Sequence, residues 1–212
     1  MTIKAIFWDN DGVLVDTERL YFAATRQILA TVGVDLTKEM YVDLNLIQGK
    51  GAWHLAKEKG ISANEVEHLR NERNSLYSKM LSHEVTVIDG IREVLNALYG
   101  KYIMGIVTSS RKDHFEIIHR STGLLKYFDF LLTGEDYTKF KPNSEPYLFA
   151  VERSGCKKDE CLAIEDSERG LISARSAGIH CYIIPTELTR CGNFSSADKV
   201  LGNIKEIISE LL

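Results

Sequence analysis

The sequence predicts an α/β fold, in which helices cover both faces of a parallel sheet and an all-helical unit is inserted into the chain. Short apolar runs bounded by turn residues alternate with longer segments of helical period, which is typical of strands buried on both faces. The stretch from about Thr17 to His83 breaks this alternation, because it is helical by pattern. With 212 residues, 44% of them hydrophobic, the chain can form a core domain with a modest insertion.

The expected strands are short and apolar: Ala5–Trp8, Ile103–Thr108, Phe130–Leu132, Leu162–Ile164 and Tyr182–Ile184. The expected helices between them are Ile91–Leu98, Phe115–Ser121, Glu145–Arg153 and Arg169–Ala177. Gly155 and Gly178 follow the last two helices and predict C-terminal caps, because glycine adopts the left-handed conformation easily. This alternation predicts a parallel sheet with helices on both sides.

The inserted stretch is interpreted as four helices: one near Arg19–Val32 that ends at Gly33, a short one from Lys38, one near Ala52–Lys59 that ends at Gly60, and a long one after Ser62. Ser62 and Glu65 fit a capping box, in which both side chains satisfy free amides of the first helical turn. The segment 85–90 is interpreted as the linker back into the sheet. We therefore assign residues 1–15 and 86–212 to a core domain and residues 16–85 to a helical cap domain.

Composition excludes several classes of partner. The net charge is -4 and no run of five basic residues occurs, which argues against nucleic acid and against a polybasic membrane surface. No apolar run approaches the roughly 20 residues that span a bilayer, and the N-terminus runs directly into an apolar strand without a signal-peptide pattern, so a cytoplasmic protein is expected. The four cysteines form no C-x-x-C pair, which favours plain thiols over metal ligands.

Two carboxylates, Asp9 and Asp11, follow the first expected strand, and Gly12 comes directly after them. Ligands bind beyond the carboxyl ends of strands in open parallel sheets. Residues two apart on an extended segment point the same way, so both carboxylates can share one site, and Gly12 permits a turn closed to residues with a Cβ. Taken alone, an Asx turn that caps the next helix explains this segment more often.

Polar groups also follow the second and third strands. Thr108, Ser109 and Ser110 offer hydroxyls and backbone amides suited to phosphate oxygens, although helix capping is the more common role of such residues. Lys141 precedes a rigid proline and can reach a phosphate as a point charge. A solvated surface lysine is the alternative explanation for it, and Lys139 competes for the same role.

Two acids, Glu165 and Asp166, end a later apolar strand. Unpaired acids at such a place are costly, so a metal partner is an economical explanation for them. Helix capping by Asp166 or Ser167 is the alternative. The coincidence of four polar segments after four strands favours one shared site over four independent caps.

These four segments resemble the motifs of the haloacid dehalogenase (HAD) superfamily in number, order and position. The family pattern hydrophobic-D-x-D-G-[TV]-L-x-D-[ST] is matched by Asp9 through Thr17 at every diagnostic position, and Thr108 and Lys141 match the second and third motifs. The segment 165–167, followed by small residues, matches the fourth. The resemblance implies a Rossmann-like core, and the insertion is similar to the small helical cap of the subgroup that contains phosphoglycolate phosphatase and β-phosphoglucomutase.

The departures from the family pattern are modest. The usual K-P-x-P-[DE] motif begins here at Lys141, and its second proline is replaced by Ser144, a candidate helix cap. Haloacid dehalogenases proper lack the second Asp of D-x-D, and phosphonate-cleaving members usually carry a small residue there. Asp11 therefore argues against both of these activities and for a phosphatase.

The resemblance implies a Mg²⁺-dependent phosphatase that acts through an aspartyl phosphate. Asp9 would attack phosphorus, and Asp11 would protonate the leaving alcohol and then activate water. The implied Mg²⁺ ligands are an Asp9 carboxylate oxygen, the Asp11 backbone carbonyl, Asp166 and waters, an all-oxygen set. The role of Glu165 stays open. Thr108, Ser109, Ser110 and Lys141 would hold the phosphate, which is chiefly a matter of positioning and charge.

The cap domain is expected to supply contacts to the substrate, through the loop Ile47–His54. Within this loop Lys50 would bind an acidic substrate, and Trp53 would pack inside the cap or stack on a ring, with packing favoured. The expected partner is a small phosphorylated metabolite. The protein itself is expected to be a monomer or a weak dimer.

Two other functions compete with hydrolysis. Sugar-phosphate mutases of this kind resemble D-[ST]-A-E-x-H after the first motif and carry an Arg in the cap loop, whereas here Tyr21 takes the place of that His and the loop has no Arg. Hydrolysis is therefore favoured. A non-catalytic phosphate-sensing module, such as a receiver domain, also clusters Asp, Thr and Lys at strand ends. Such a module lacks a helical insertion after the first strand, so it is disfavoured.

Overall fold

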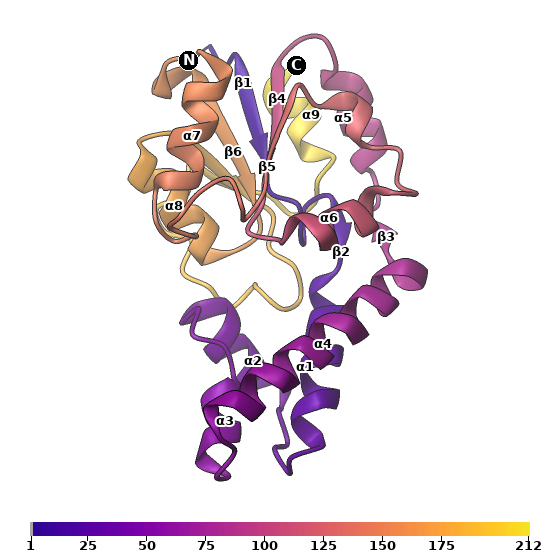
Figure 1. The fold of residues 1–212 in the computed structure, drawn as a ribbon. Helices are drawn as coiled ribbons and strands as arrows, with labels where there is room; N and C mark the ends of the chain where they lie inside the picture. The colour runs from indigo at the N-terminus through magenta and orange to yellow at the C-terminus, as the bar shows by residue number, and fades with distance from the viewer. Residues whose placement is uncertain (1) are drawn as a thin grey trace. The chain divides into compact units, whose positions relative to one another are not determined.

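The core of the fold is a parallel sheet with the strand order β5-β4-β1-β6-β7-β8 (Figure 1). The structure is a computed structural model and describes residues 2–212. The strands are β1 (Ala5–Trp8), β4 (Ile103–Val107), β5 (Phe130–Leu132), β6 (Cys161–Glu165), β7 (His180–Ile183) and β8 (Lys199–Val200). Each neighbouring pair runs parallel. The predicted α/β class is confirmed, and β8 is an edge strand that the sequence did not indicate.

The register of β1 decides where the polar residues gather. Trp8, the last residue of β1, pairs with Ile106 of β4 and with Ile164 of β6. The segments that follow these positions therefore leave the sheet at one edge, the carboxyl edge, where ligands bind in open parallel sheets. Three of the four polar segments are brought together by this register alone.

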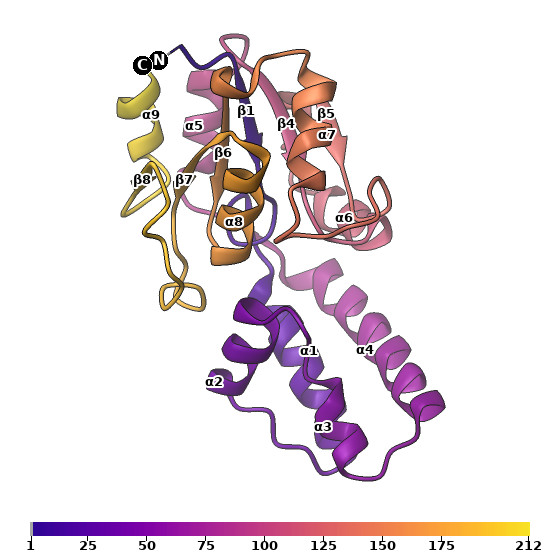
Figure 2. The ribbon, with the colours of Figure 1, turned by 90° about the vertical axis from the view of Figure 1, so that its left-hand side faces the viewer.

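Helices cover both faces of the sheet, with α5 and α9 on one face and α7 and α8 on the other (Figures 1 and 2). The side chains of β1 alternate, so Ile6 and Trp8 pack with the first group and Ala5 and Phe7 with the second. The helices of this part are α5 (Ile91–Leu98), α6 (Lys112–His119), α7 (Glu145–Ser154), α8 (Glu168–Ala177) and α9 (Glu206–Leu211), with 3₁₀ turns η2 (Leu125–Tyr127) and η3 (Lys158–Glu160).

Several boundaries differ from the predicted ones for local reasons. β4 ends at Val107 and not at Thr108, whose hydroxyl bonds to Asp11. α6 begins at Lys112, before the predicted start at Phe115, because the Phe115 N–H already bonds the carbonyl of Arg111. The predicted caps of α7 and α8, Gly155 and Gly178, are confirmed, since both have left-handed conformations.

The inserted stretch forms a second compact unit, Thr17–Val85, with a core of its own. Its elements are α1 (Glu18–Ala30), α2 (Lys38–Tyr41), the π-helical segment η1 (Val42–Ile47), α3 (Trp53–Glu58) and α4 (Ala63–Glu84). The capping box of Ser62 and Glu65 begins α4, as predicted. Trp53 is 7% exposed and belongs to the core of this unit, so the expectation that it packs is confirmed. The sequence did not indicate η1.

One boundary residue is assigned differently from the sequence prediction. Asp16 belongs to the first unit, which also holds the chain from Thr86 onward. The reason is a short antiparallel pair of strands, β2 (Val15–Asp16) and β3 (Thr86–Val87), in which Asp16 pairs with Thr86. The sequence did not indicate this pair of strands in the segment that returns to the first unit.

Two further features concern membrane-spanning helices and the state of the cysteines. Within residues 2–212, no helix combines the length and the apolar character that crossing a bilayer requires. The four cysteines are free thiols: Cys161 and Cys181 are buried, Cys156 is half-buried and Cys191 is exposed.

Candidate active site

The centre of the candidate site is the ammonium group of Lys141, which is only 5% exposed. Its Nζ donates to Asp9 Oδ1 at 2.6 Å, to Glu165 Oε1 at 2.6 Å and to the carbonyl of Val107 at 2.8 Å. A lysine ammonium has three N–H donors, so all of them are used and the side chain is held from three sides. Lys139, the competing candidate, is exposed.

Negative charge exceeds positive charge around Lys141. One carboxylate oxygen from each of Asp9, Glu165 and Asp166 lies within 4.8 Å of the others, and all three residues are buried. Burial raises the pKa of the Asp9 carboxyl, and the neighbouring Lys141 ammonium opposes this rise. Burial would lower the pKa of Lys141, but Asp9 and Glu165 outweigh it and raise that pKa. One ammonium faces three acids, so these oxygens suit a further cation.

The second acid of the D-x-D motif, Asp11, is held by hydroxyls that follow β4. Its Oδ2 accepts from Ser110 Oγ at 2.7 Å and from Thr108 Oγ1 at 3.2 Å. The cap position of α6 is Arg111, which makes no side-chain cap bond, so these hydroxyls do not cap that helix. The carboxylates of Asp9 and Asp11 therefore have separate partners: a cation for the first and neutral hydroxyls for the second.

Ser109 lies beside a tyrosine that the sequence did not single out. Its side chain is exposed, and its nearby hydroxyl acts to lower the pKa of the Tyr137 phenol. The Tyr137 hydroxyl donates to the carbonyl of Thr108 at 2.6 Å. Burial raises the pKa of Tyr137 to about 12, so the phenol keeps its proton and stays a donor. Tyr137 therefore fixes the backbone of the segment that carries Thr108 and Ser109.

Asp166 is placed against the D-x-D loop by a close backbone approach. Gly12 has φ +87°, and a Cβ there would lie 2.4 Å from Asp166 Oδ2, so no larger residue fits. Helix capping by Asp166 does not occur, because Ser167 caps α8 by accepting from the Gly170 N–H at 3.2 Å. The Asp166 carboxylate is therefore not used as the cap of α8 and lies beside the D-x-D loop.

Glu165, whose role the sequence left open, is a fully buried partner of Lys141. Its Oε1 also accepts from the Tyr147 hydroxyl of α7 at 2.6 Å. Two donors on one oxygen hold this carboxylate in place, so it fixes Lys141 in turn. Nothing in the sequence separates Tyr147 from an ordinary core aromatic. Ser144, at the cap position of α7, makes no side-chain cap bond.

The first unit thus brings together seven of the predicted residues, Asp9, Asp11, Thr108, Ser109, Ser110, Lys141 and Asp166. Lys50 lies in the second unit, on the rim of a pocket there. The segments that hold the seven are the loops after β1, β4, β5 and β6, which is the arrangement expected from the register of the sheet.

Comparison with known proteins finds relatives that match this chain over most of its length. The chain is 30% identical to the putative phosphatase YhcW of Bacillus subtilis, over 99% of this chain and 96% of that protein. It is 30% identical to a phosphorylated carbohydrates phosphatase of Thermotoga maritima, over 84% and 82%. The solved structure of a putative β-phosphoglucomutase from Thermotoga maritima matches with a TM-score of 0.78 and 26% identity, over 99% of this chain and 100% of that one.

The family profile described as haloacid dehalogenase-like hydrolase matches residues 6–184, which is most of the chain and includes the whole inserted unit. The match begins in β1 and ends just after β7, so it contains every residue of the candidate site. Relatives of similar length are named phosphatases, and this protein is an enzyme of the phosphatase class. The chain belongs to the haloacid dehalogenase-like hydrolase family.

Proposed function

We propose that this enzyme is a Mg²⁺-dependent phosphatase that hydrolyses a small phosphomonoester through a phosphorylated Asp9. The observation that carries this proposal is the buried group of Asp9, Lys141 and Asp166 beside an Asp11 that is held by two hydroxyls. The proposed nucleophile Asp9, the proposed proton carrier Asp11 and the cationic Lys141 thus lie at the same edge of the sheet.

A divalent cation fits the residues present. Asp9 and Asp166, with the Asp11 backbone carbonyl implied by the family motif, would hold Mg²⁺, and their oxygen atoms are the ligands that it prefers. When bound, the ion would neutralise charge that builds up on the phosphate. Because Asp9 and the phosphate are both anionic, their approach is unfavourable unless cations balance them.

Each residue of the group has a role that its contacts allow. Asp9 attacks phosphorus, and Lys141, held by Glu165, neutralises part of the charge of the phosphoryl group. Asp11 protonates the leaving alcohol and then takes a proton from the water that hydrolyses the Asp9 phosphate. Thr108, with Ser109 and Ser110, would donate to phosphoryl oxygens, and for this the hydroxyls of Thr108 and Ser110 turn from Asp11 to the bound phosphate. All these residues come from one chain, so a monomer or a weak dimer suffices.

Hydrolysis and phosphate transfer to a sugar differ in what attacks the phosphorylated Asp9. A mutase must exclude water and hold a phosphorylated sugar in two orientations. Here Tyr21, at the position of the mutase His, packs its ring against Tyr77 at 5.1 Å and under the Arg73 guanidinium at 4.2 Å, where it serves the core of the second unit. We therefore expect water to be the acceptor.

The test measures products. With glucose 1-phosphate or a better phosphomonoester, inorganic phosphate and free alcohol should appear one for one, without a bisphosphate activator. A phosphate-release assay beside ³¹P NMR, with and without a bisphosphate, separates the two reactions. Rapid isomerisation to the 6-phosphate with little phosphate released would favour the mutase and keep the roles of Asp9 and Asp11.

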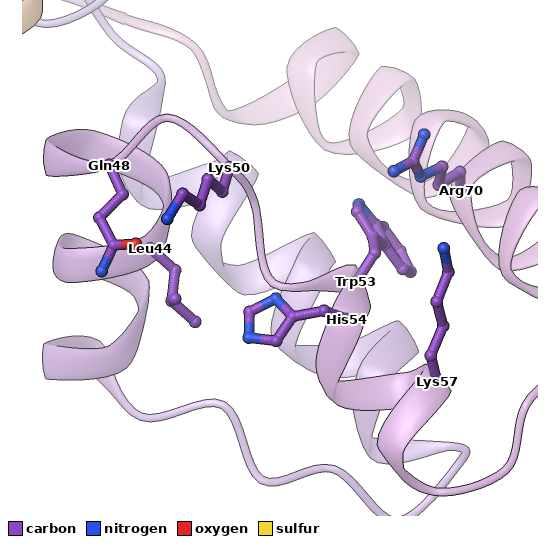
Figure 3. A pocket seen from close by; sticks show the side chains of 7 residues that line it. All are labelled: Leu44, Gln48, Lys50, Trp53, His54, Lys57 and Arg70. Carbon is purple, nitrogen blue, oxygen red and sulfur yellow. The ribbon is translucent and has the colours of Figure 1, made fainter.

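A pocket of about 380 Å³ in the second unit supports an anionic substrate (Figure 3). In Figure 3, Lys50 and His54 lie to one side of Trp53, and Lys57 and Arg70 to the other. The unit has as many acidic as basic residues, yet no acid lines this pocket within the described chain. We propose that Lys50 contributes to binding of an anionic group of the metabolite.

Lys50→Ala is expected to raise KM for phosphate esters with a second anionic group by about fivefold, since one exposed charge contact is worth up to about 1 kcal/mol. KM for p-nitrophenyl phosphate should change less than about twofold, because that ester has no second anionic group. Lys59→Ala is the matched control, since Lys59 is exposed on the same unit and does not line the pocket. Equal losses on all esters in Lys50→Ala would remove Lys50 from substrate recognition.

A further inference from the structure

The residue between the two catalytic acids, Asn10, is fully buried. Its backbone carbonyl accepts from the N–H groups of Leu14 and Val15 at 2.9 and 3.1 Å, which closes the turn after Asp11. Its side-chain Oδ1 lies 2.8 Å from Nε2 of His119. Asn10 is therefore the point at which the loop with Asp9 and Asp11 is tied to the interior of the first unit.

His119, the last residue of α6, is oriented by its other ring nitrogen. His119 Nδ1 lies 2.9 Å from Thr122 Oγ1, and that oxygen already accepts from the Leu124 N–H at 3.3 Å. The Thr122 hydroxyl can then donate to Nδ1, which leaves the ring proton on Nε2 and directs it to Asn10 Oδ1. The ring also contacts Phe115 at a centroid distance of 4.4 Å. These contacts leave His119 one orientation.

The imidazole is neutral at ordinary pH. Burial lowers the pKa of His119 to about 4, although Asp11 acts in the opposite direction. A neutral ring with a fixed tautomer is a hydrogen-bond donor of constant geometry, and it does not exchange protons with the substrate. His119 would therefore hold Asn10 in place and would not act as an acid or a base.

Both ends of α6 thus hold the same loop. Before its first residue, Ser110 donates to Asp11 at 2.7 Å, and at its last residue His119 holds Asn10. We propose that His119 is a positioning residue, which through Asn10 sets the direction of the Asp9 and Asp11 carboxylates. This inference rests on the proposed function for its kinetic consequence, because misplacing reacting groups by about 1 Å can cost a hundredfold in rate.

A purely structural role makes a different prediction. Removing one partner of a buried hydrogen bond costs stability, whereas replacing both by apolar groups of similar shape is nearly neutral. The variants are therefore His119→Leu, His119→Gln and the double variant Asn10→Leu with His119→Leu. Gln can present an N–H near the position of Nε2. Tyr127→Phe is the control, since it removes a hydrogen bond to Asn96 (2.8 Å) in the same unit, away from the loop.

The measurements are kcat and KM for p-nitrophenyl phosphate with Mg²⁺ and the urea midpoint of unfolding. His119→Leu should lower kcat at least about tenfold with KM changed less than about threefold, and His119→Gln should stay within about threefold of wild-type kcat. The double variant should recover the urea midpoint but not kcat. Tyr127→Phe should lower only the midpoint. Recovery of kcat together with the midpoint, or an unchanged kcat in His119→Leu, would overturn the positioning role.

Hydrogen exchange separates this inference from the proposed function. If the wild-type enzyme did not hydrolyse any ester with Mg²⁺, the proposed function would fail, and exchange of the Leu14 and Val15 amides would decide the inference. These amides should exchange at least about tenfold faster in the double variant than in the wild type at equal urea midpoint, because the loop loses its tie to α6. Unchanged exchange would contradict the role of His119 whatever the activity.

Discussion

Asp9→Asn is expected to lower kcat for p-nitrophenyl phosphate at least about a thousandfold and to leave the protein folded. An amide is a far poorer nucleophile than a carboxylate, and Glu165 cannot take the place of Asp9, because Lys141 and Tyr147 hold the Glu165 carboxylate. The fold should persist because the Asn amide oxygen can still accept from Lys141, which also keeps its bonds to Glu165 and Val107. The expected loss in free energy of unfolding is below about 2 kcal/mol.

The measurement combines initial rates with Mg²⁺ and urea unfolding. Asp35→Asn is the matched control, because it makes the same chemical change at an exposed position of the second unit. It should change neither property. Activity of Asp9→Asn above about a tenth of wild type would assign the nucleophile to another residue, since removal of a nucleophile normally costs far more.

Removal of divalent metal by EDTA is expected to lower turnover on the order of a hundredfold or more, and added Mg²⁺ should restore it. The reason is the charge of the site. The carboxylates of Asp9, Glu165 and Asp166 face a single ammonium, and a phosphate adds about two further negative charges at neutral pH. Ca²⁺ should not restore activity, because it takes more and longer oxygen contacts than Mg²⁺ and misplaces the attacking carboxylate.

Asp166→Asn tests the same metal site by changing a proposed ligand and leaving Mg²⁺ in solution. The Mg²⁺ concentration that gives half-maximal activity should rise about tenfold or more, whereas Asp35→Asn should leave it unchanged. Mg²⁺ should also raise the thermal midpoint of the wild type, because a ligand of the folded state stabilises it, and this shift should be smaller in Asp166→Asn. Full activity after exhaustive chelation would show that the charge argument fails.

The sequence alone could place the two acids of the D-x-D segment next to one another, because their relation is local. Asp9 and Asp11 are two residues apart next to a strand end, and this spacing alone places them near one another. Lys141 could not be separated from Lys139 on that basis, because the two lie in one polar segment. Burial separates them: Lys141 forms ion pairs with Asp9, just after β1, and with Glu165 of β6, whereas Lys139 is exposed.

The sequence by itself determined the alternation of strands and helices, the helical insertion and the capping glycines, because each depends on short-range periodicity or on the conformational freedom of one residue. Only the tertiary structure decided which groups meet. The pairing of Glu165 with Lys141 and Tyr147, and of Asn10 with His119, joins segments far apart in the chain through the register of the sheet and the packing of α6 and α7. No local pattern encodes such contacts, because their free energy arises only when the strands and helices are packed together.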